Sequence, residues 1–231
     1  MILGFYGCHN SGKTTLIEKL IPELKLKGYS VATLKNIPRE FSIDAEGKDT
    51  FKHKQAGSGL VAASSENETA FIFNERMNFN EIIEKIKNDG YDVILVEGYK
   101  RQVIPKVKVG EIETMENTVF EYDGSNFSGI LDYIIKEVEV QRIYKKLPRI
   151  DCKKCGFVCR EMAELIFNKE KEYNDCKIIS EEEGDLLIEV NGKKIWTGGF
   201  VKNTVKNVIF GLVSSLKGGD DAKEINIKIK M

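Results

Sequence analysis

The stretch that decides the fold lies near the start of the chain, where an apolar segment runs directly into a glycine-rich turn. Residues 2–6 read Ile-Leu-Gly-Phe-Tyr, and residues 7–14 read Gly-Cys-His-Asn-Ser-Gly-Lys-Thr. The second run matches the phosphate-binding pattern G-x-x-x-x-G-K-S/T. Apolar residues recur at helical spacing over 13–27. The order of buried strand, turn and amphipathic helix is the context that this pattern requires.

Each residue type in the turn has a physical reason to be there. Glycines let the backbone bend so that successive N–H groups point at phosphate oxygens, and the following helix adds its positive end. We expect Lys13 to reach the β- and γ-phosphates and Thr14 to bind Mg²⁺ through its hydroxyl. The full set expected to bind the nucleotide at this turn is Gly7, Asn10, Ser11, Gly12, Lys13, Thr14 and Thr15.

Two more segments are expected at the carboxyl edge of a parallel sheet, where ligands bind. Residues 92–96 form a continuous apolar run typical of a buried strand, and Glu97 follows directly. Glu97 is the candidate for the carboxylate that holds Mg²⁺, and with Lys13 it forms the predicted catalytic pair. In the loop after the second strand, Asp44 is a candidate magnesium ligand, and Lys48 and Asp49 are candidate nucleotide contacts. A solvated strand-end acid and a solvated loop are the alternative interpretations.

Strands alternate with helices over residues 1–147, which predicts an α/β, P-loop NTPase-like domain with a mostly parallel sheet and flanking helices. Residues 148–231 are expected to form a second, small α+β domain. The first domain is expected to contain strands at 2–6, 30–35, 59–63, 69–73 and 92–96, edge strands at 106–109 and 118–122, and helices at 13–27, 79–88 and 127–138. The second is expected to contain helices at 159–169 and 201–216, a hairpin of 186–190 with 193–197, and a last strand at 225–229.

Composition and charge narrow the function. The chain has 231 residues, with 35 basic and 36 acidic side chains and a net charge of −1. Such a balance gives no field that favours nucleic acid or an anionic membrane. Apolar runs stay far below the ~20 residues of a membrane-spanning helix, and the first residues lack the features of a signal peptide. We therefore expect a cytoplasmic protein.

Four of the five cysteines are concentrated in one short stretch. Their spacing is Cys152-x₂-Cys155-x₃-Cys159-x₁₆-Cys176, and the fifth is Cys8 in the glycine-rich turn. Three close thiolates and one distant thiolate favour a 4Fe–4S cluster. Structural Zn²⁺ and the absence of any metal remain alternatives, because zinc ribbons prefer two separated C-x₂-C pairs.

Several of these segments together carry a family resemblance over roughly residues 1–145. They are residues 7–24, Val31-Ala32-Thr33-Leu34-Lys35, the polar loop with Asp44 and Gly47–Thr50, and Val96-Glu97-Gly98-Tyr99-Lys100 with Pro105-Lys106 following. This set resembles the molybdopterin-guanine dinucleotide biosynthesis protein B (MobB) family. The resemblance implies a dimeric P-loop protein that binds GTP, hydrolyses it slowly if at all, and assists the enzyme joining GMP to molybdopterin. The implied partner is that guanylyltransferase or a molybdoenzyme that receives the cofactor.

The resemblance also implies that Gly12, Lys13 and Thr14 bind phosphate and magnesium and that Glu97 lies near the metal. In the family a histidine-containing stretch follows the lysine of the second strand, but residues 36–41 contain no histidine, so no such role is carried over. An N/T-K-x-D segment that reads guanine is also absent, so motifs alone leave ATP and GTP open.

The cysteine stretch resembles the small four-cysteine cluster domain of corrinoid iron–sulfur proteins, which is also attached to some archaeal relatives of MobB. The third gap in that domain is often four residues, whereas here it is three. Two alternative functions remain at this point. One is a P-loop metallochaperone. Such proteins usually carry a metal-binding thiolate motif within the GTPase domain, whereas Cys8 is the only cysteine of the first domain here. The other is a nucleotide switch controlled by a redox-sensing iron–sulfur cluster.

Overall fold

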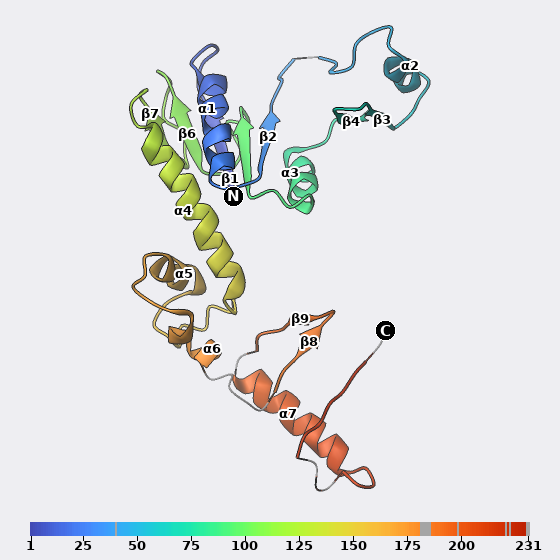
Figure 1. Ribbon diagram of the computed structural model, residues 1–231, viewed down its shortest axis with the longest axis vertical. Helices are drawn as coiled ribbons and strands as arrows, with labels where there is room; N and C mark the ends of the chain where they lie inside the picture. Colours follow the sequence, from blue (N-terminus) through green and yellow to red (C-terminus); the bar gives the residue numbers. More distant parts are fainter. Residues whose placement is uncertain (40, 181–185, 198, 220, 222, 230–231) are drawn as a thin grey trace. The chain divides into compact units, whose positions relative to one another are not determined.

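The structure is a computed structural model that describes the whole chain apart from residues 40, 181–185, 198, 220, 222 and 230–231. Its contacts divide the chain into two compact units, Met1–Ile135 and Lys136–Met231. The division falls inside helix α4 (Phe127–Lys146), ahead of the boundary expected at 147/148. Figure 1 shows how the elements follow one another along the chain.

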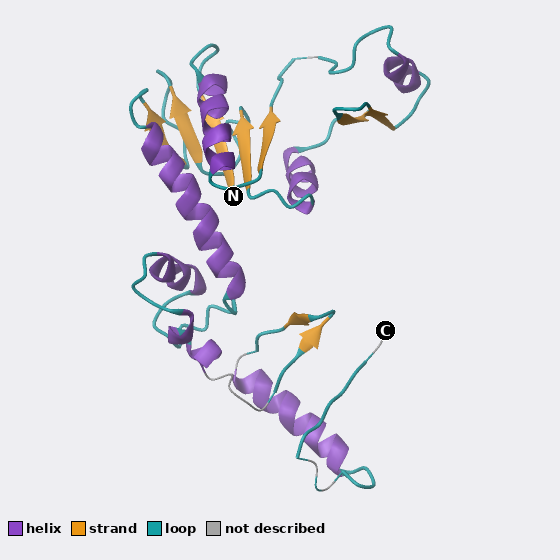
Figure 2. Cartoon of the chain, viewed as in Figure 1, coloured by secondary structure: helices purple, strands orange, loops and turns teal. Residues whose placement is uncertain are grey.

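The first unit is built on a five-stranded sheet with the strand order β2-β5-β1-β6-β7 (Figure 2). Its strands are β1 (Ile2–Tyr6), β2 (Val31–Lys35), β5 (Val93–Glu97), β6 (Lys106–Val109) and β7 (Thr118–Tyr122). Every neighbouring pair in this sheet is parallel. The predicted α/β class is confirmed. Because all five carboxyl ends lie at one edge, the loops after β1, β2 and β5 are brought together.

Helices α1 (Lys13–Leu26) and α3 (Phe79–Asn88) belong to the same unit. Ile94 and Val96 of β5 form a buried cluster with Phe79 and Ile83 of α3, and burying each such side chain contributes ~1.5–3 kcal/mol. Helix α3 begins at this place because the side chain of its N-cap, Asn78, accepts a hydrogen bond from the backbone of Glu81. This packing sets the position of the segment just before α3.

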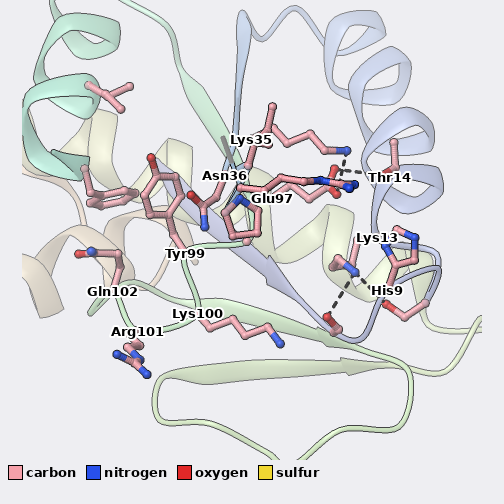
Figure 3. A pocket seen from close by; sticks show the side chains of 18 of the residues that line it. His9, Lys13, Thr14, Lys35, Asn36, Glu97, Tyr99, Lys100, Arg101 and Gln102 are labelled. Atoms are coloured by element: carbon pink, nitrogen blue, oxygen red, sulfur yellow. Dashed lines mark hydrogen bonds and ion pairs between the residues drawn. The ribbon is translucent and has the colours of Figure 1, made fainter. Parts of the chain in front are cut away.

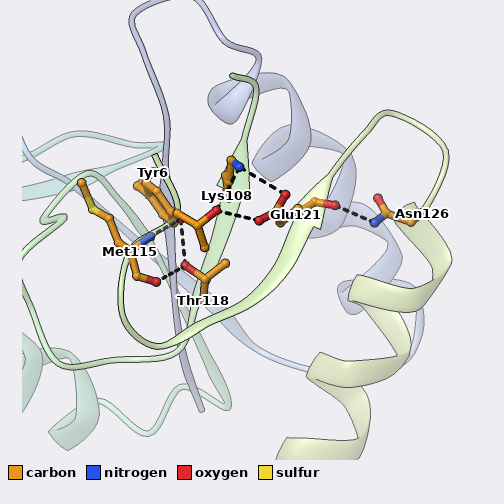
Figure 4. A network of polar contacts seen from close by, with 7 residues as sticks. Tyr6, Lys108, Met115, Thr118, Glu121 and Asn126 are labelled. Carbon is orange, nitrogen blue, oxygen red and sulfur yellow. Dashed lines mark hydrogen bonds and ion pairs between the residues drawn. The ribbon is translucent and has the colours of Figure 1, made fainter. Parts of the chain in front are cut away.

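Strand β6 lies inside the sheet between β1 and β7, so its predicted edge position is wrong. The two lysines of β6 are a feature that exposed sheet edges often share. In the structure Lys106 is buried and donates to the carbonyl oxygen of Glu116 at 2.9 Å. Lys108 pairs with Glu121 of β7 at 3.2 Å (Figure 4). Both ammonium groups therefore have partners within the fold.

A short helix and hairpin interrupt the alternation between β2 and α3. They are α2 (Asp49–Gln55) and the antiparallel pair β3 (Leu60–Ser64) and β4 (Thr69–Phe73). Strands were expected at 59–63 and 69–73, which the pair confirms to within one residue.

The second unit contains the end of α4 and a series of short elements. These are α5 (Cys159–Phe167), the 3₁₀ helix η1 (Tyr173–Asp175), α6 (Lys177–Ser180), β8 (Glu189–Val190), β9 (Lys193–Lys194) and α7 (Gly199–Ser214). Its buried cluster joins Val140 and Leu147 to Met162 and Ile178. Helix α4 extends beyond the predicted end at 138 because its last turns supply part of this cluster.

Two predicted elements of the second unit differ from the structure. The hairpin around Asn191-Gly192 is present but has two residues per strand, β8 with β9. Residues 224–229 have no regular structure, so the strand predicted at 225–229 is wrong. None of the described strands pairs with residues 224–229. In the described part of the chain, no helix combines the length and the apolar character needed to cross a membrane.

Candidate functional site

The turn between β1 and α1 has the shape of a phosphate cradle. Gly12 is the N-cap of α1, with φ of 92°, and no side chain caps the helix, so its first N–H groups remain for a ligand. Gly7 permits the close approach of the turn to β6, since a Cβ there would collide with the carbonyl oxygen of Val109. Gly110, at φ of 79°, passes over Ser11, whose Cβ would lie 3.1 Å from a Cβ added at residue 110. Glycine is therefore required on both sides of this contact.

The ammonium group of Lys13 lies over the turn. It donates to the carbonyl oxygens of Gly7, at 3.3 Å, and of Cys8, and to Oγ of Ser11 at 3.2 Å. Burial lowers the pKa of Lys13, and the nearby Glu97 carboxylate opposes that shift. Oxygens of the turn thus hold the Lys13 ammonium group over the turn, where it could contact the phosphates of a bound nucleotide.

Glu97 is the acidic centre of the site (Figure 3). Thr14 Oγ1 donates to Glu97 Oε2 at 3.0 Å, and Lys35 Nζ lies 3.1 Å from Glu97 Oε1. The Glu97 side chain is 15% exposed, whereas that of Lys35 is 57% exposed. The structure thus brings Lys13, Thr14 and Glu97 together as predicted. A hydroxyl and a carboxylate oxygen side by side are ligands that Mg²⁺ accepts.

These residues line one end of a cleft of about 1790 Å³. Six cations line it, with Glu97 as the one carboxylate among the described lining residues. The cleft is lined by Gly7, residues 9–15, residues 35–39, residues 76–79, Ile82 and residues 97–102. A cleft with this charge favours a ligand that carries several negative charges.

Other residues expected at the site are not in the cleft lining. Asp44 Oδ1 accepts a hydrogen bond from Thr50 at 2.8 Å, Lys48 is the N-cap of α2, and Asp49 pairs with Lys52. None of Asp44, Lys48 and Asp49 lines the cleft, so their contacts with the nucleotide stay predictions. Glu40, in the stretch without histidine, lies outside the described residues.

The sequence reasoning missed the cations and the aromatic ring that line the rest of the cleft. Lys35 ends β2, and Tyr99, Lys100 and Arg101 follow β5. Their position directly after two neighbouring parallel strands was the available signal, because such loops share one edge of the sheet. Arg76 precedes α3 and had no comparable signal, since its placement depends on how α3 packs on β5.

The four clustered cysteines all line one small apolar cavity in the second unit. Leu147, Ile150, Phe157, Met162 and Ile178 are among its other walls. Cys159 and Cys176 are buried, Cys155 is half-buried and Cys152 is exposed. Burial raises the pKa of the Cys159 thiol, and the Cys159 backbone donates to Asp151 Oδ1 at 2.7 Å.

Four thiols around one apolar cavity have the chemistry that an iron–sulfur cluster or a zinc ion requires. Within the described residues, however, no three histidine, cysteine or carboxylate side chains come close enough together to hold a metal ion. The four thiols therefore line the same cavity, but their present positions do not form a complete metal-coordination shell.

Comparison with known families identifies the first unit. The family model described as "Molybdopterin guanine dinucleotide synthesis protein B" matches residues 2–131, more than half of the chain. The chain belongs to the MobB family. A second model, described as "Putative Fe-S cluster", matches residues 147–178, which include all four clustered cysteines. The two matches are separated by residues 132–146, all of which belong to α4.

Two relatives carry names that agree with this assignment, and a solved structure is also similar. A Methanocaldococcus jannaschii protein named "Putative molybdopterin-guanine dinucleotide biosynthesis adapter protein" is 27% identical over 237 residues, covering 99% of this chain and 97% of that protein. The corresponding adapter protein of Haemophilus influenzae is 35% identical over 108 residues, covering 46% of this chain and 61% of its own length. The crystal structure of Bacillus subtilis MobB, 21% identical, covers 59% of this chain and 96% of its own, with a TM-score of 0.47.

Proposed function

We propose that this MobB family member is a GTP-binding adapter in molybdopterin-guanine dinucleotide biosynthesis that assists the enzyme transferring GMP to molybdopterin. The observation that carries the proposal is the meeting of Lys13, Thr14 and Glu97 in one cationic cleft. The full-length similarity to a protein named as such an adapter supports the pathway.

Magnesium would be held by Thr14 and Glu97, whose oxygens already lie 3.0 Å apart. When bound there, the ion would neutralise charge on the terminal phosphates. Lys13 and the free N–H groups at the start of α1 would orient the same phosphates. The two carboxylate oxygens of Glu97 already have partners, Thr14 and Lys35, so neither is free to take a proton from water. We therefore expect at most slow GTP hydrolysis.

For the second unit we propose an iron–sulfur cluster, of the 4Fe–4S type, held by Cys152, Cys155, Cys159 and Cys176. The match of residues 147–178 to the iron–sulfur model and the shared cavity support a cluster over zinc. We propose the functional division as a P-loop domain of 1–147 and a four-cysteine domain of 148–231. The beginning of the iron–sulfur match at residue 147 supports that boundary.

The proposed partner is the molybdopterin guanylyltransferase or a molybdoenzyme that receives the finished cofactor. The adapter name of the relatives supports a protein partner in that pathway. We further propose that the chain acts as a homodimer in the cytoplasm, as the family resemblance implies.

A reconstituted GMP-transfer reaction tests the adapter function. It contains a guanylyltransferase, molybdopterin, GTP and Mg²⁺, with or without this protein purified under anaerobic conditions. We expect the wild-type chain to raise the yield of dinucleotide cofactor, and Lys13→Ala to remove that gain because it takes away the phosphate-binding charge. Lys19→Ala, an exposed lysine of α1 outside the cleft, is the matched control. An equal yield with Lys13→Ala, or no gain with the wild type, would contradict the proposal.

A further inference from the structure

The cleft continues well beyond the predicted nucleotide site. We call this part the outer lobe; residues 36–39, 76–79, Ile82 and 98–102 form it. The whole cleft, which consists of the phosphate end and the outer lobe, has a volume of about 1790 Å³. Pockets for one small ligand usually measure about 300–1,000 Å³. A single nucleotide therefore leaves much of the cleft unfilled.

If the nucleotide binds as proposed above, its terminal phosphate would point toward the outer lobe. Mg²⁺ bridges the β- and γ-phosphates in P-loop proteins. Because Thr14 and Glu97 would hold that ion, the γ-phosphate would lie near the end of β5. The loop after Glu97 forms one wall of the lobe, and Tyr99, Arg101 and Gln102 belong to this loop (Figure 3). A ligand in the lobe would face the γ-phosphate.

The positive charges that line the lobe favour an anionic ligand. Arg39, Arg76, Lys100 and Arg101 line it, and none of them makes a hydrogen bond or ion pair with another described residue. Lys100 also repels Lys13, which lowers the pKa of Lys13 further. Guanidinium groups bind phosphate through two parallel hydrogen bonds, so paired arginines select this group. Three of the four cations are arginines, and of these Arg76 and Arg101 are the two most distant in sequence from the P-loop.

Two aromatic rings also line the lobe. The rings of Phe79 and Tyr99 lie 5.0 Å apart with an interplanar angle of 55°. Tyr99 has a φ of 51° and follows Gly98 at 90°, a backbone form that is rare for tyrosine. Such strain gathers at binding sites, where it holds a side chain in a required direction. Asn36 and Gln102 line the same part of the cleft as Tyr99, and their amides can each donate and accept hydrogen bonds.

From these features we propose that the outer lobe binds a second ligand, a phosphorylated heteroaromatic compound, at the same time as the nucleotide. Its phosphate would contact Arg76 and Arg101, its ring would lie against Tyr99, and its polar edge would face Asn36 and Gln102. The inference rests on the proposed nucleotide site, because that site defines which end of the cleft remains open. The chain would then hold two phosphorylated ligands side by side for its partner.

The test uses riboflavin 5′-phosphate as a fluorescent probe of this chemical class. It is titrated into the full-length protein saturated with Mg²⁺ and a non-hydrolysable GTP analogue, while calorimetry measures GTP affinity separately. We expect saturable binding with quenched fluorescence, and no displacement of the analogue. Riboflavin without its phosphate, and inorganic phosphate without a ring, should each bind at least about tenfold more weakly.

Variants separate the lobe from the nucleotide site. The double variant Arg76→Ala, Arg101→Ala should weaken probe binding by about tenfold or more while GTP affinity stays within about threefold of wild type. Tyr99→Leu should weaken binding of the probe but not of inorganic phosphate. Lys25→Ala, in the last turn of α1, is the matched control and should change neither.

Three results would overturn the inference. They are the absence of saturable probe binding, displacement of the probe by the GTP analogue, and equal probe affinity in the double variant. Loss of GTP binding by the wild-type protein would instead contradict the proposed function, so the two failures are distinguishable.

Discussion

At the scale of single residues, one carboxylate organises the phosphate end of the cleft. Glu97 accepts from Thr14 with one oxygen and pairs with Lys35 through the other. Its side chain is only 15% exposed, so its charge is poorly screened by water. A magnesium ion arriving with the nucleotide would compete with the Lys35 ammonium for that charge. Metal binding at this site is therefore expected to depend on the charge of Glu97 more than on its shape.

Glu97→Gln tests this dependence. Glutamine keeps the size and the oxygen that accepts from Thr14 but removes the negative charge. We expect the Mg²⁺ concentration needed for half-maximal nucleotide binding to rise by about tenfold, while binding in EDTA stays equal or becomes tighter. The measurement is a Mg²⁺ titration of a fluorescent GTP analogue bound to each protein.

Glu113→Gln provides the control, because it removes a carboxylate that lies outside the cleft lining. A Mg²⁺ dependence of Glu97→Gln identical to that of the wild type would remove Glu97 from the metal site.

At the scale of elements, the parts that repeat with a clear period could be predicted from the sequence. The buried strands β1 and β5 and the amphipathic helices α1 and α3 were predicted to within about two residues. The phosphate end of the cleft was predictable for the same reason, because its residues follow β1 and β5 directly. The outer lobe was not, since α3 must be placed against β5 before Phe79 and Tyr99 meet.

Errors in the predicted elements have physical causes in tertiary contacts. Strand β6 carries two lysines, as exposed edge strands often do, yet it lies inside the sheet. Lys106 donates a hydrogen bond to the carbonyl oxygen of Glu116, and Lys108 forms an ion pair with Glu121. Figure 4 also shows the hydrogen bond of Tyr6 Oη with Thr118, which ties β1 to β7 across β6. Residues 224–229 alternate like a strand but lack a described partner strand, and pairing is what makes a strand.

The cysteine cavity yields a prediction at this scale, because its donors come from four separate positions around α5 and η1. Protein purified without oxygen should be brown and contain about four irons per chain. Cys155→Ser should lose most of this iron, since it removes one corner of the cluster. Cys8→Ser, which alters the cysteine outside the cavity, should retain it. Iron and visible absorbance are measured on all three proteins.

The metal content decides between the alternatives. Colourless protein with one zinc per chain would replace the cluster with a structural zinc site. Equal iron in Cys155→Ser and the wild type would contradict the assignment of the four cysteines.

At the scale of the whole molecule, two compact units have different chemistry. The MobB match covers the unit with the cationic cleft, and the iron–sulfur match covers residues of the unit with the cysteine cavity. Helix α4 continues from one unit into the other, and its last turns supply core residues of the second. The relative from Methanocaldococcus jannaschii matches across 99% of the chain, so its similarity extends over both units.

Titration calorimetry with GTP and then ATP, each with Mg²⁺, tests the nucleotide site of this molecule most directly. Anaerobically purified wild type and Lys13→Ala are compared, with far-UV circular dichroism to confirm that the variant is folded. We predict one GTP bound per chain, at least about tenfold more tightly than ATP, which corresponds to about 1.4 kcal/mol, and no measurable binding to Lys13→Ala. A preference for ATP would break the link to GMP transfer, and unchanged GTP affinity in folded Lys13→Ala would contradict the site itself.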